Sequence, residues 1–286
     1  MTAGARPGST RGVTSSTRTL ALLGDPVGHS LSPVLQNAAC QAAGVDGVYL
    51  AIRCDSEGLA GLLTGLARAG GGGNVTLPHK GDAAGLVDRP TEAVRRTGAC
   101  NTFWAEQGLI HGDNTDVEGF RRALESVFPG PHVGMRVLLA GAGGAARAIL
   151  VALMDLGVRE VNVVNRSHER ARAMARRIGG ERVRVLESVR DASGEDYDLV
   201  VNATSVGLES RDPAMIDLEA LGRAGGVMDI VYGSGGTRLL ASAAELGVPA
   251  CDGLGMLLHQ GAVAFERWWG EPAPLEAMER ALAEAV

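Results

Sequence analysis

Residues 136–166 read RVLLAGAGGAARAILVALMDLGVREVNVVNR, and this stretch decides the fold. Residues 137–140 form a continuous apolar run, as a buried parallel strand does, and a helical segment and a second apolar strand follow. The glycines between them allow a tight turn and let backbone N–H groups approach a pyrophosphate at the helix N-terminus. Because strand, glycine loop, helix and strand occur in the required order, the stretch predicts a dinucleotide-binding βαβ unit. The residues expected at the pyrophosphate are Gly141, Ala142, Gly143, Gly144, Ala145 and Ala146, with the last in the third glycine position.

The end of the second strand indicates which dinucleotide the unit binds. In NAD-specific folds an Asp or Glu, roughly 20 residues after the glycines, bonds the ribose 2′-hydroxyl. This chain has Asn165-Arg166-Ser167 there, and Arg170 follows one helical turn after Arg166. A guanidinium offers planar, bidentate donors to a phosphate. The sequence therefore predicts NADP as the cofactor; the alternative is that both arginines are solvated charges on a surface helix.

Composition limits the class of protein. At 286 residues the chain is long enough for two domains, and 21% charged residues are typical of a soluble globular protein. The net charge of -6 is spread without long runs of one sign, so we expect a small-molecule substrate rather than a nucleic-acid partner.

The cysteines and the N-terminal segment indicate the cellular setting. Cys40, Cys54, Cys100 and Cys251 form no Cys-x-x-Cys pair, and the six histidines show no ligand spacing. We expect reduced thiols in a cytoplasmic protein and no metal site. Residues 1–18 are rich in Gly, Ser, Thr and Arg without an apolar core, which fits neither a secretory signal nor a membrane anchor. A disordered tail and no membrane partner are the predictions.

Short apolar strands alternate with helical segments along the chain, which predicts an α/β fold. A helix over 116–127 followed by Pro129-Gly130-Pro131 marks a passage between domains. The other segments are expected at 20–23, 33–43, 47–52, 58–69, 73–76, 145–156, 161–165, 169–178, 198–202, 226–231, 248–250, 254–269 and 274–285. We predict a tail at 1–18, an α/β substrate domain at 19–117, a Rossmann-type NADP-binding domain at 118–251, and C-terminal helices at 252–286 that pack back on the substrate domain.

One predicted strand delivers a lysine at its end. The run GNVTLPHK at 73–80 is cut at Pro78, which cannot donate to a ladder, so Lys80 follows directly after the strand. A lysine at a strand end suits a catalytic site, and the alternative is a surface lysine in a loop. A second run, GDNTD at 112–116, precedes a helix, where Asp, Asn and Thr are ordinary N-caps.

Two serines precede another predicted helix. The run GDPVGHSLSP at 24–33 places Ser30 and Ser32 two residues apart, before a helix that Pro33 can start. Hydroxyls at this point either cap the helix or bind a small anion. Four further polar runs follow along the chain: GACNT at 98–102, NATSVG at 202–207, DIVY at 229–232 and DGLGMLLHQ at 252–260.

Each of these runs has a structural explanation as a turn or a cap, but their joint occurrence in this order does not. Together with the glycine loop they closely resemble the shikimate dehydrogenase family, from about residue 20 to 270. In that family a substrate domain and an NADP-binding Rossmann domain face one another across a cleft. They reversibly reduce 3-dehydroshikimate to shikimate in chorismate and aromatic amino-acid biosynthesis. The resemblance implies the same fold, cofactor and activity here.

The resemblance also implies roles for individual residues. Lys80 and Asp116 would be the catalytic pair, with Lys80 as general acid/base and Asp116 orienting it. Chemistry supports the pair, because hydride delivery to a ketone leaves an alkoxide that needs a proton donor. The implied substrate-binding residues are Ser30 and Ser32 at the carboxylate, and Thr76, Asn101, Tyr232 and Gln260 at the carboxylate or the ring hydroxyls. The implied cofactor residues are Asn165, Arg166, Ser167 and Arg170 at the 2′-phosphate, and Thr204, Ser205 and Gly253 at the nicotinamide end.

Related activities remain as alternatives. Ser32 favours shikimate, since relatives that use quinate tend to carry threonine there, and Arg166 favours NADP over NAD. The chain departs from the family pattern at Ser234, near Tyr232, where proline is usual, so a quinate or aminoshikimate dehydrogenase is the alternative enzyme. An NADP-sensing binding module is the alternative from another class; it predicts loss of Lys80 or Asp116, and both are present. The sequence does not determine the oligomeric state, and a homodimer is one assembly that it allows.

Overall fold

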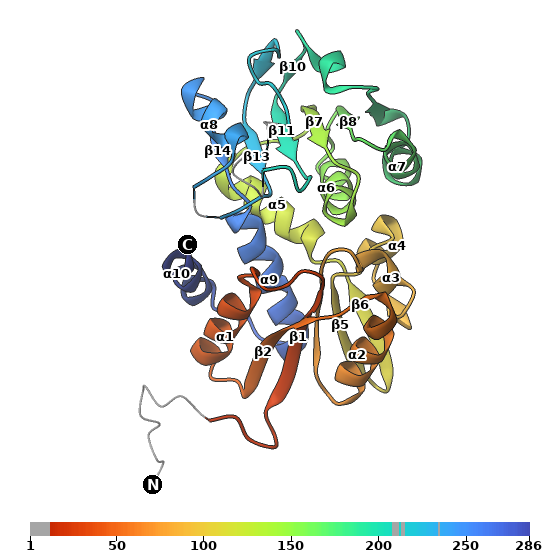
Figure 1. The fold of residues 1–286 in the computed structure, drawn as a ribbon, viewed down its shortest axis with the longest axis vertical. Coiled ribbons are helices and arrows are strands. Elements are labelled where there is room, and N and C mark those ends of the chain that lie inside the picture. The colour runs from red at the N-terminus through yellow and green to blue at the C-terminus, as the bar shows by residue number, and fades with distance from the viewer. Residues whose placement is uncertain (1–11, 208–211, 213–214, 234) are drawn as a thin grey trace.

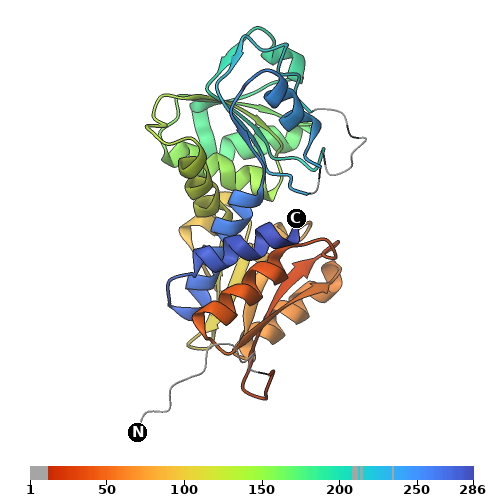
Figure 2. The same ribbon diagram turned by 90° about the vertical axis from the view of Figure 1, so that its left-hand side faces the viewer.

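The computed structural model describes residues 12–207, 212, 215–233 and 235–286. Two α/β units are stacked along the long axis of the molecule (Figures 1 and 2). Two helices, α5 (Asp116–Val127) and α9 (Leu254–Trp269), run through the middle and join the units. This arrangement confirms the α/β class and the Rossmann-type second unit that the sequence predicts.

The first unit is built on a six-stranded mixed sheet with the order β2-β1-β3-β5-β6-β4. Strands β1, β2 and β3 are parallel because helices return the chain across the sheet between them. The strands are β1 (Arg18–Gly24), β2 (Gly47–Arg53), β3 (Gly72–Val75), β4 (Arg89–Pro90), β5 (Thr102–Glu106) and β6 (Leu109–Asp113). The helices are α1 (Ser32–Ala43), α2 (Ser56–Arg68), α3 (Lys80–Ala84) and α4 (Glu92–Thr97).

Strands β5 and β6 form an antiparallel hairpin that strand–helix alternation did not predict. Its turn consists of Gln107 and Gly108, which have φ angles of 53° and 79°. Positive φ at both central residues is the turn geometry that matches the twist of paired strands, and Gln-Gly is a weaker sequence signal for it than Asn-Gly. The hairpin positions the site, because β6 ends at Asp113, directly before α5.

The second unit is a parallel six-stranded sheet with the order β14-β13-β11-β7-β8-β9. The chain proceeds from β7 to one side of the sheet and then to the other, so the loops after β7 and β11 diverge at the crevice where open α/β sheets bind ligands. The strands are β7 (Arg136–Ala140), β8 (Glu160–Val164), β9 (Val183–Val185), β11 (Leu199–Asn202), β13 (Val227–Asp229) and β14 (Ala250–Cys251), with a separate pair β10 (Asp196–Tyr197) and β12 (Arg223–Ala224). The helices are α6 (Gly144–Asp155), α7 (His168–Met174), a π-helical turn (Ala175–Gly179), two 3₁₀ turns (Gly180–Arg182 and Val189–Ala192) and α8 (Arg238–Glu245).

The two units touch where α4 meets α6 (Figure 1). The Arg147 guanidinium on α6 donates to the carbonyls of Thr97 and Gly98, at 3.2 Å each. Arg96 of α4 forms a bidentate ion pair with Asp155 at the other end of α6, at 2.8 and 2.9 Å. The helix that follows the glycine loop is therefore fixed to the first unit at both of its ends.

The C-terminal helices return to the first unit, as predicted. Helices α9 and α10 (Leu275–Ala285) pack against α1, and Leu35, Phe265 and Met278 are fully buried between them.

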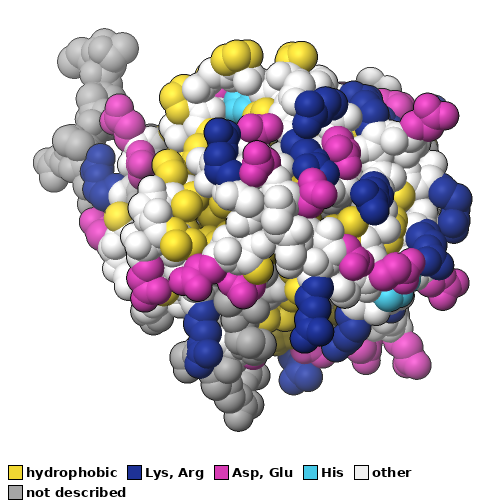
Figure 3. Space-filling view, turned by 90° about the horizontal axis from the view of Figure 1, so that it is seen from above, with side chains coloured by type: hydrophobic (Ala, Val, Ile, Leu, Met, Phe, Trp, Pro, Cys, Tyr) yellow, Lys and Arg dark blue, Asp and Glu magenta, His cyan; other side chains and the backbone are white. Residues whose placement is uncertain are grey.

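The face of the second unit seen from above carries Lys and Arg side chains interspersed with Asp and Glu (Figure 3).

The last two residues of the predicted tail, Thr17 and Arg18, make long-range hydrogen bonds. Residues 1–11 lie outside the described residues, but β1 already begins at Arg18. The Arg18 guanidinium donates to the carbonyls of Gly70 and Trp268, and the Thr17 hydroxyl donates to Asp46 at 2.8 Å. These bonds fix the last part of a segment whose composition alone indicates a tail, because composition does not show long-range partners.

The crossing of α5 and α9 depends on a glycine. A Cβ atom on Gly119 of α5 would lie 2.6 Å from the Cβ atom and 2.7 Å from the backbone nitrogen of Gln260 on α9. No ordinary contact is that short, so only glycine lets the two helices approach this closely. The crossing holds the end of α5 that carries Asp116 beside α9.

We expect Gly119→Ala to destabilise the protein by about 1–3 kcal/mol, the usual cost of overpacking a close contact. Gly61, exposed on α2, is a matched control because no atom outside its own helix lies within 4 Å of a Cβ there. Gly61→Ala should raise the stability by roughly 0.5–1 kcal/mol, because alanine loses less backbone entropy in a helix. Thermal unfolding monitored by circular dichroism measures both, and shifts of the same sign would contradict the close contact.

Candidate active site

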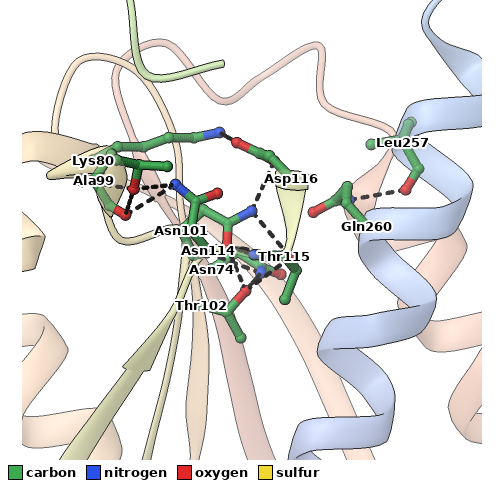
Figure 4. Close-up of polar contacts among 11 residues, drawn as sticks. Asn74, Lys80, Ala99, Asn101, Thr102, Asn114, Thr115, Asp116, Leu257 and Gln260 are labelled. Carbon is green, nitrogen blue, oxygen red and sulfur yellow. Dashed lines mark hydrogen bonds and ion pairs between the residues drawn. The ribbon is translucent and has the colours of Figure 1, made fainter. Parts of the chain in front are cut away.

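An ion pair between Lys80 and Asp116 lies at the junction of the two units. Lys80 begins α3, after the strand end and Pro78, and Asp116 begins α5. The Lys80 Nζ atom donates to Asp116 Oδ2 at 2.5 Å, and the side chains are only 16% and 6% exposed (Figure 4). Low exposure strengthens the interaction between the two charges. The residues predicted as a pair are therefore in direct contact.

Asn101 connects this pair to the sheet of the first unit. Its Nδ2 atom donates to the second Asp116 oxygen, Oδ1, at 2.8 Å. Its Oδ1 atom accepts from the Thr115 backbone N–H at 2.8 Å and from the Thr102 hydroxyl at 2.8 Å. Asn74 in turn donates to the Thr102 hydroxyl at 2.9 Å. A buried chain of hydrogen bonds thus fixes both oxygens of the Asp116 carboxylate.

Sequence reasoning missed part of this chain. Thr115 precedes α5 as a capping residue would, yet its side chain makes no capping bond and contacts the Asn101 and Thr102 side chains instead. Asn74 was not singled out either. The available signal was that both belong to the polar runs GNVTLPHK and GDNTD, which end at the lysine and at the aspartate.

The glycine loop of the second unit reaches the lysine. A Cβ atom on Gly144, the first residue of α6, would lie 3.2 Å from Lys80 Cδ and 3.5 Å from Lys80 Cβ. The Lys80 carbonyl also accepts from the Cys100 N–H at 2.8 Å, which fixes the lysine backbone beside Asn101. The predicted dinucleotide loop and the predicted proton donor are thus neighbours.

The other predicted substrate residues make no hydrogen bond to the pair within the described part of the chain. Gln260 projects from α9 toward Asp116 and donates to the Leu257 carbonyl at 2.9 Å (Figure 4). Ser32 begins α1, and its N–H donates to the Ser30 hydroxyl at 3.2 Å, while the N-cap residue is Leu31, which makes no side-chain capping bond. Thr76 follows β3 and is half-buried.

Tyr232 follows β13 in the second unit. It is half-buried and packs against the apolar cluster formed by α1, α9 and α10, and this burial raises the pKa of its phenol. The hydroxyl is therefore protonated at neutral pH and can donate a hydrogen bond. Ser234, where the chain departs from the family pattern, lies outside the described residues.

The glycine loop fits a pyrophosphate. Gly141 has φ +117°, and a Cβ there would lie 2.6 Å from the Ala203 carbonyl oxygen. Gly143 has open space around the position of a Cβ, and α6 begins after it without a side-chain cap or an acidic residue in its first turn. Ala142 in the loop and Ala146 in α6 are buried, and Ala145 is half-buried. Free N–H groups and a positive helix end are what a phosphate requires.

The end of β8 fits a 2′-phosphate. Arg166 and Arg170 are exposed, and no carboxylate occupies the position that NAD-specific folds use. The Asn165 amide donates to the Ser167 carbonyl at 2.8 Å, and the Ser167 hydroxyl caps α7 by accepting from the Arg170 N–H. Burial, and to a smaller extent the charges of Arg177 and Arg170, lower the pKa of Arg147 on the neighbouring helix α6.

The residues expected at the nicotinamide end lie on two loops, one after β11 and one before α9. Thr204 follows β11 and donates to the Asn202 side chain at 2.7 Å, and Ser205 is exposed next to it. Gly253 is buried, and a Cβ there would collide with the Ile230 carbonyl oxygen. Gly253 therefore allows the close approach of the chain before α9 to the end of β13.

Within the described ranges, no group of three or more His, Cys, Asp or Glu side chains is arranged to hold a metal ion. The four cysteines are free thiols. Over the same residues, no helix combines the length and the apolar character that crossing a bilayer requires.

A Rossmann-type unit whose glycine loop touches a buried lysine–carboxylate pair on a second α/β unit defines a two-domain dinucleotide-dependent dehydrogenase. The family models agree. Residues 22–103 match the shikimate dehydrogenase substrate binding domain, 124–211 match shikimate/quinate 5-dehydrogenase, and 253–283 match the shikimate 5′-dehydrogenase C-terminal domain.

Individual relatives extend the match to nearly the whole chain. The NADP(+)-dependent shikimate dehydrogenase of Rhizobium rhizogenes is 41% identical over 266 residues, covering 91% of this chain and 92% of its own length. The crystal structure of Thermus thermophilus shikimate 5-dehydrogenase with NADP(H) and shikimate has a TM-score of 0.84 at 37% identity, covering 94% and 99%. Quinate dehydrogenase of Corynebacterium glutamicum with NAD also has a TM-score of 0.84, at 30% identity over 94% and 99%. The chain belongs to the shikimate dehydrogenase family.

Asp116→Asn should lower kcat/KM by about 10²-fold, a typical contribution of proton transfer by a positioned group. The substitution keeps the size of the side chain but removes the charge that orients the Lys80 ammonium. Asp46→Asn, at the Thr17 contact remote from the site, is the matched control and should keep wild-type rates. Steady-state assays with NADP and shikimate measure both variants; a D116N enzyme as active as D46N would exclude the orienting role of Asp116.

Proposed function

We propose that the protein catalyses the reversible NADP-dependent reduction of 3-dehydroshikimate to shikimate. The observation that carries the proposal is the contact between the Lys80–Asp116 pair and Gly144 of the dinucleotide loop, which brings a proton donor to the cofactor side of the site. Family membership supports the same activity. In this proposal residues 19–117 bind the substrate, 118–251 bind NADP, and 252–286 complete the substrate domain.

Lys80 acts as the general acid and base. NADPH, when bound, supplies the hydride that reduces the ketone carbon. The Lys80 ammonium donates a proton to the carbonyl oxygen as the hydroxyl forms, and in the reverse direction the Lys80 amine accepts it. Asp116 holds Lys80 Nζ in place, and Asn101 fixes the Asp116 carboxylate through its second oxygen.

Polar side chains on both units hold the substrate. Ser30 and Ser32 offer hydroxyls at the N-terminal end of α1 for the substrate carboxylate, and this helix end favours an anion. Thr76, Asn101, Tyr232 and Gln260 hold the carboxylate or the ring hydroxyls of the substrate. Because Tyr232 belongs to the second unit and the others do not, substrate binding depends on the relative position of the units.

Cofactor binding uses the loops at the edge of the parallel sheet. Gly141–Ala146 hold the pyrophosphate; Asn165, Arg166, Ser167 and Arg170 hold the 2′-phosphate; Thr204, Ser205 and Gly253 line the nicotinamide end. Arg166 and Arg170 are exposed, and neither side chain forms an ion pair with another described residue. They favour NADP over NAD, because a phosphate pairs with a guanidinium in a bidentate manner.

We also propose a cytoplasmic location, which the four free thiols support. A homodimer is the assembly to test: light scattering after size-exclusion chromatography distinguishes one chain mass from two.

Initial rates with shikimate and quinate, each against NADP and NAD, test the substrate and the cofactor together. We expect kcat/KM for shikimate with NADP to exceed the other three combinations by roughly tenfold or more, a difference that a few polar contacts provide. Dominant quinate turnover with NAD would instead favour the activity of the Corynebacterium glutamicum relative. Absence of NADPH oxidation with 3-dehydroshikimate would reject the proposed function.

The double variant Arg166→Ala/Arg170→Ala should raise the KM for NADP roughly tenfold or more. Each charge-assisted hydrogen bond to the 2′-phosphate contributes about 1.5–3 kcal/mol, and this contribution is lost with the guanidinium group. The KM for NAD should stay nearly constant, because NAD lacks the 2′-phosphate. Arg172→Ala on the same helix is the matched control, since Arg172 already pairs with Glu187 at 2.6 Å. Equal losses with NADP and NAD would contradict the assignment of the 2′-phosphate site.

A further inference from the structure

Two buried polar side chains lie side by side where β11 and β13 end. Asn202 and Asp229 are partners in the parallel register and are 1% and 0% exposed. The Asn202 Nδ2 atom donates to Asp229 Oδ1 at 2.9 Å. Among the described residues no cationic side chain pairs with this carboxylate, and its burial raises its pKa. A buried acid without a cation is costly unless hydrogen bonds satisfy its oxygens, so its partners show what it holds.

Asp229 holds the segment that carries Tyr232. Its Oδ1 atom accepts from the Val231 N–H at 3.1 Å, directly before the tyrosine. Its Oδ2 atom accepts from the Thr237 hydroxyl at 2.7 Å. The same hydroxyl caps α8 by accepting from the Leu240 N–H at 3.3 Å, so the carboxylate connects the strand end to the start of the next helix.

Asn202 holds the neighbouring turn, Thr204–Gly207. Its Oδ1 atom accepts from the Thr204 N–H at 3.1 Å and from the Thr204 hydroxyl at 2.7 Å, and its Nδ2 atom donates to the Val206 carbonyl at 3.0 Å. The two held segments also touch, because a Cβ on Gly207 would lie 3.1 Å from Thr237 Cγ2.

We propose that Asp229 is a positioning residue that fixes the turn Thr204–Gly207, through Asn202, and the dipeptide Val231–Tyr232, through the Val231 N–H, as one rigid unit. The turn belongs to the cofactor side of the proposed site and Tyr232 to its substrate side, so the inference rests on the proposed function. With the carboxylate in place, the distance between the turn Thr204–Gly207 and Tyr232 stays constant. Without it, the Asn202 amide, the Val231 N–H and the Thr237 hydroxyl lose an acceptor at once.

Asp229→Ala tests this directly. We expect the NADPH dissociation constant and the shikimate KM to rise together, each roughly tenfold, and kcat to fall, since misplacement by an ångström costs up to about 10²-fold. Asp229→Asn keeps an oxygen for Asn202 and Val231, and its NH2 group can donate to the Thr237 hydroxyl oxygen, so it should restore both constants to near wild-type values. NADPH fluorescence titration and steady-state kinetics give the constants. An altered folded fraction changes the apparent kcat but neither constant, so a merely structural role predicts unchanged constants.

A matched control and a milder variant complete the experiment. Asp198→Ala removes an acceptor of the Arg136 N–H at the opposite end of β11 and should leave both constants unchanged. Thr237→Val deletes one donor to Asp229 together with the side-chain cap of α8, and should raise the shikimate KM severalfold even where D229A does not fold. Unchanged constants in D229A, or an unchanged KM in T237V, overturn the proposal. The NADPH titration needs no turnover, so it remains informative when wild-type protein fails to reduce 3-dehydroshikimate, an outcome that rejects the proposed function alone.

Discussion

The buried ion pair between Lys80 and Asp116 is the interaction on which the rest of the site depends. Two charges removed from water are tolerated only when their remaining hydrogen-bonding groups find partners, because desolvation otherwise outweighs their attraction. Asn101 provides that partner for Asp116, and Thr115 and Thr102 hold Asn101. The pair lies 36 residues apart in sequence, so the hairpin β5–β6 between them is what brings α5 back to α3.

Close approaches at two glycines place this pair between the units. Gly119 lets α9 cross α5 directly beside Asp116, which puts Gln260 next to the pair. Gly144 lets the start of α6 lie against the Lys80 side chain, and Arg147 and Asp155 fix α6 to α4. As a result, Lys80 of the first unit lies beside the glycine loop of the second unit. The brace of Asn202 and Asp229 serves the same end within the second unit.

The sequence predicts much of the fold because its elements have strong local signals. The βαβ unit follows from its apolar strand and glycines, and α5 and α9 occur where the apolar pattern and flanking residues indicate, at Asp116–Val127 and Leu254–Trp269. The hairpin was missed because Gln107-Gly108 is a weak turn signal. The hydrogen bonds of Asn101 and Asp229 join residues that are distant along the chain, and no local pattern reveals such contacts. The roles of the site residues stay predictions, supported by family resemblance and geometry.

The most direct test of the central claim is the turnover of 3-dehydroshikimate by Lys80→Met, measured at saturating NADPH beside the binding constants of NADPH and shikimate. Methionine keeps most of the aliphatic stem that packs against Gly144 but has no proton to donate. The account predicts a fall in kcat of about 10²–10⁴-fold, the usual contribution of general acid catalysis, with NADPH binding nearly unchanged. A kcat close to that of the wild-type enzyme would contradict it and assign the proton donor to another group.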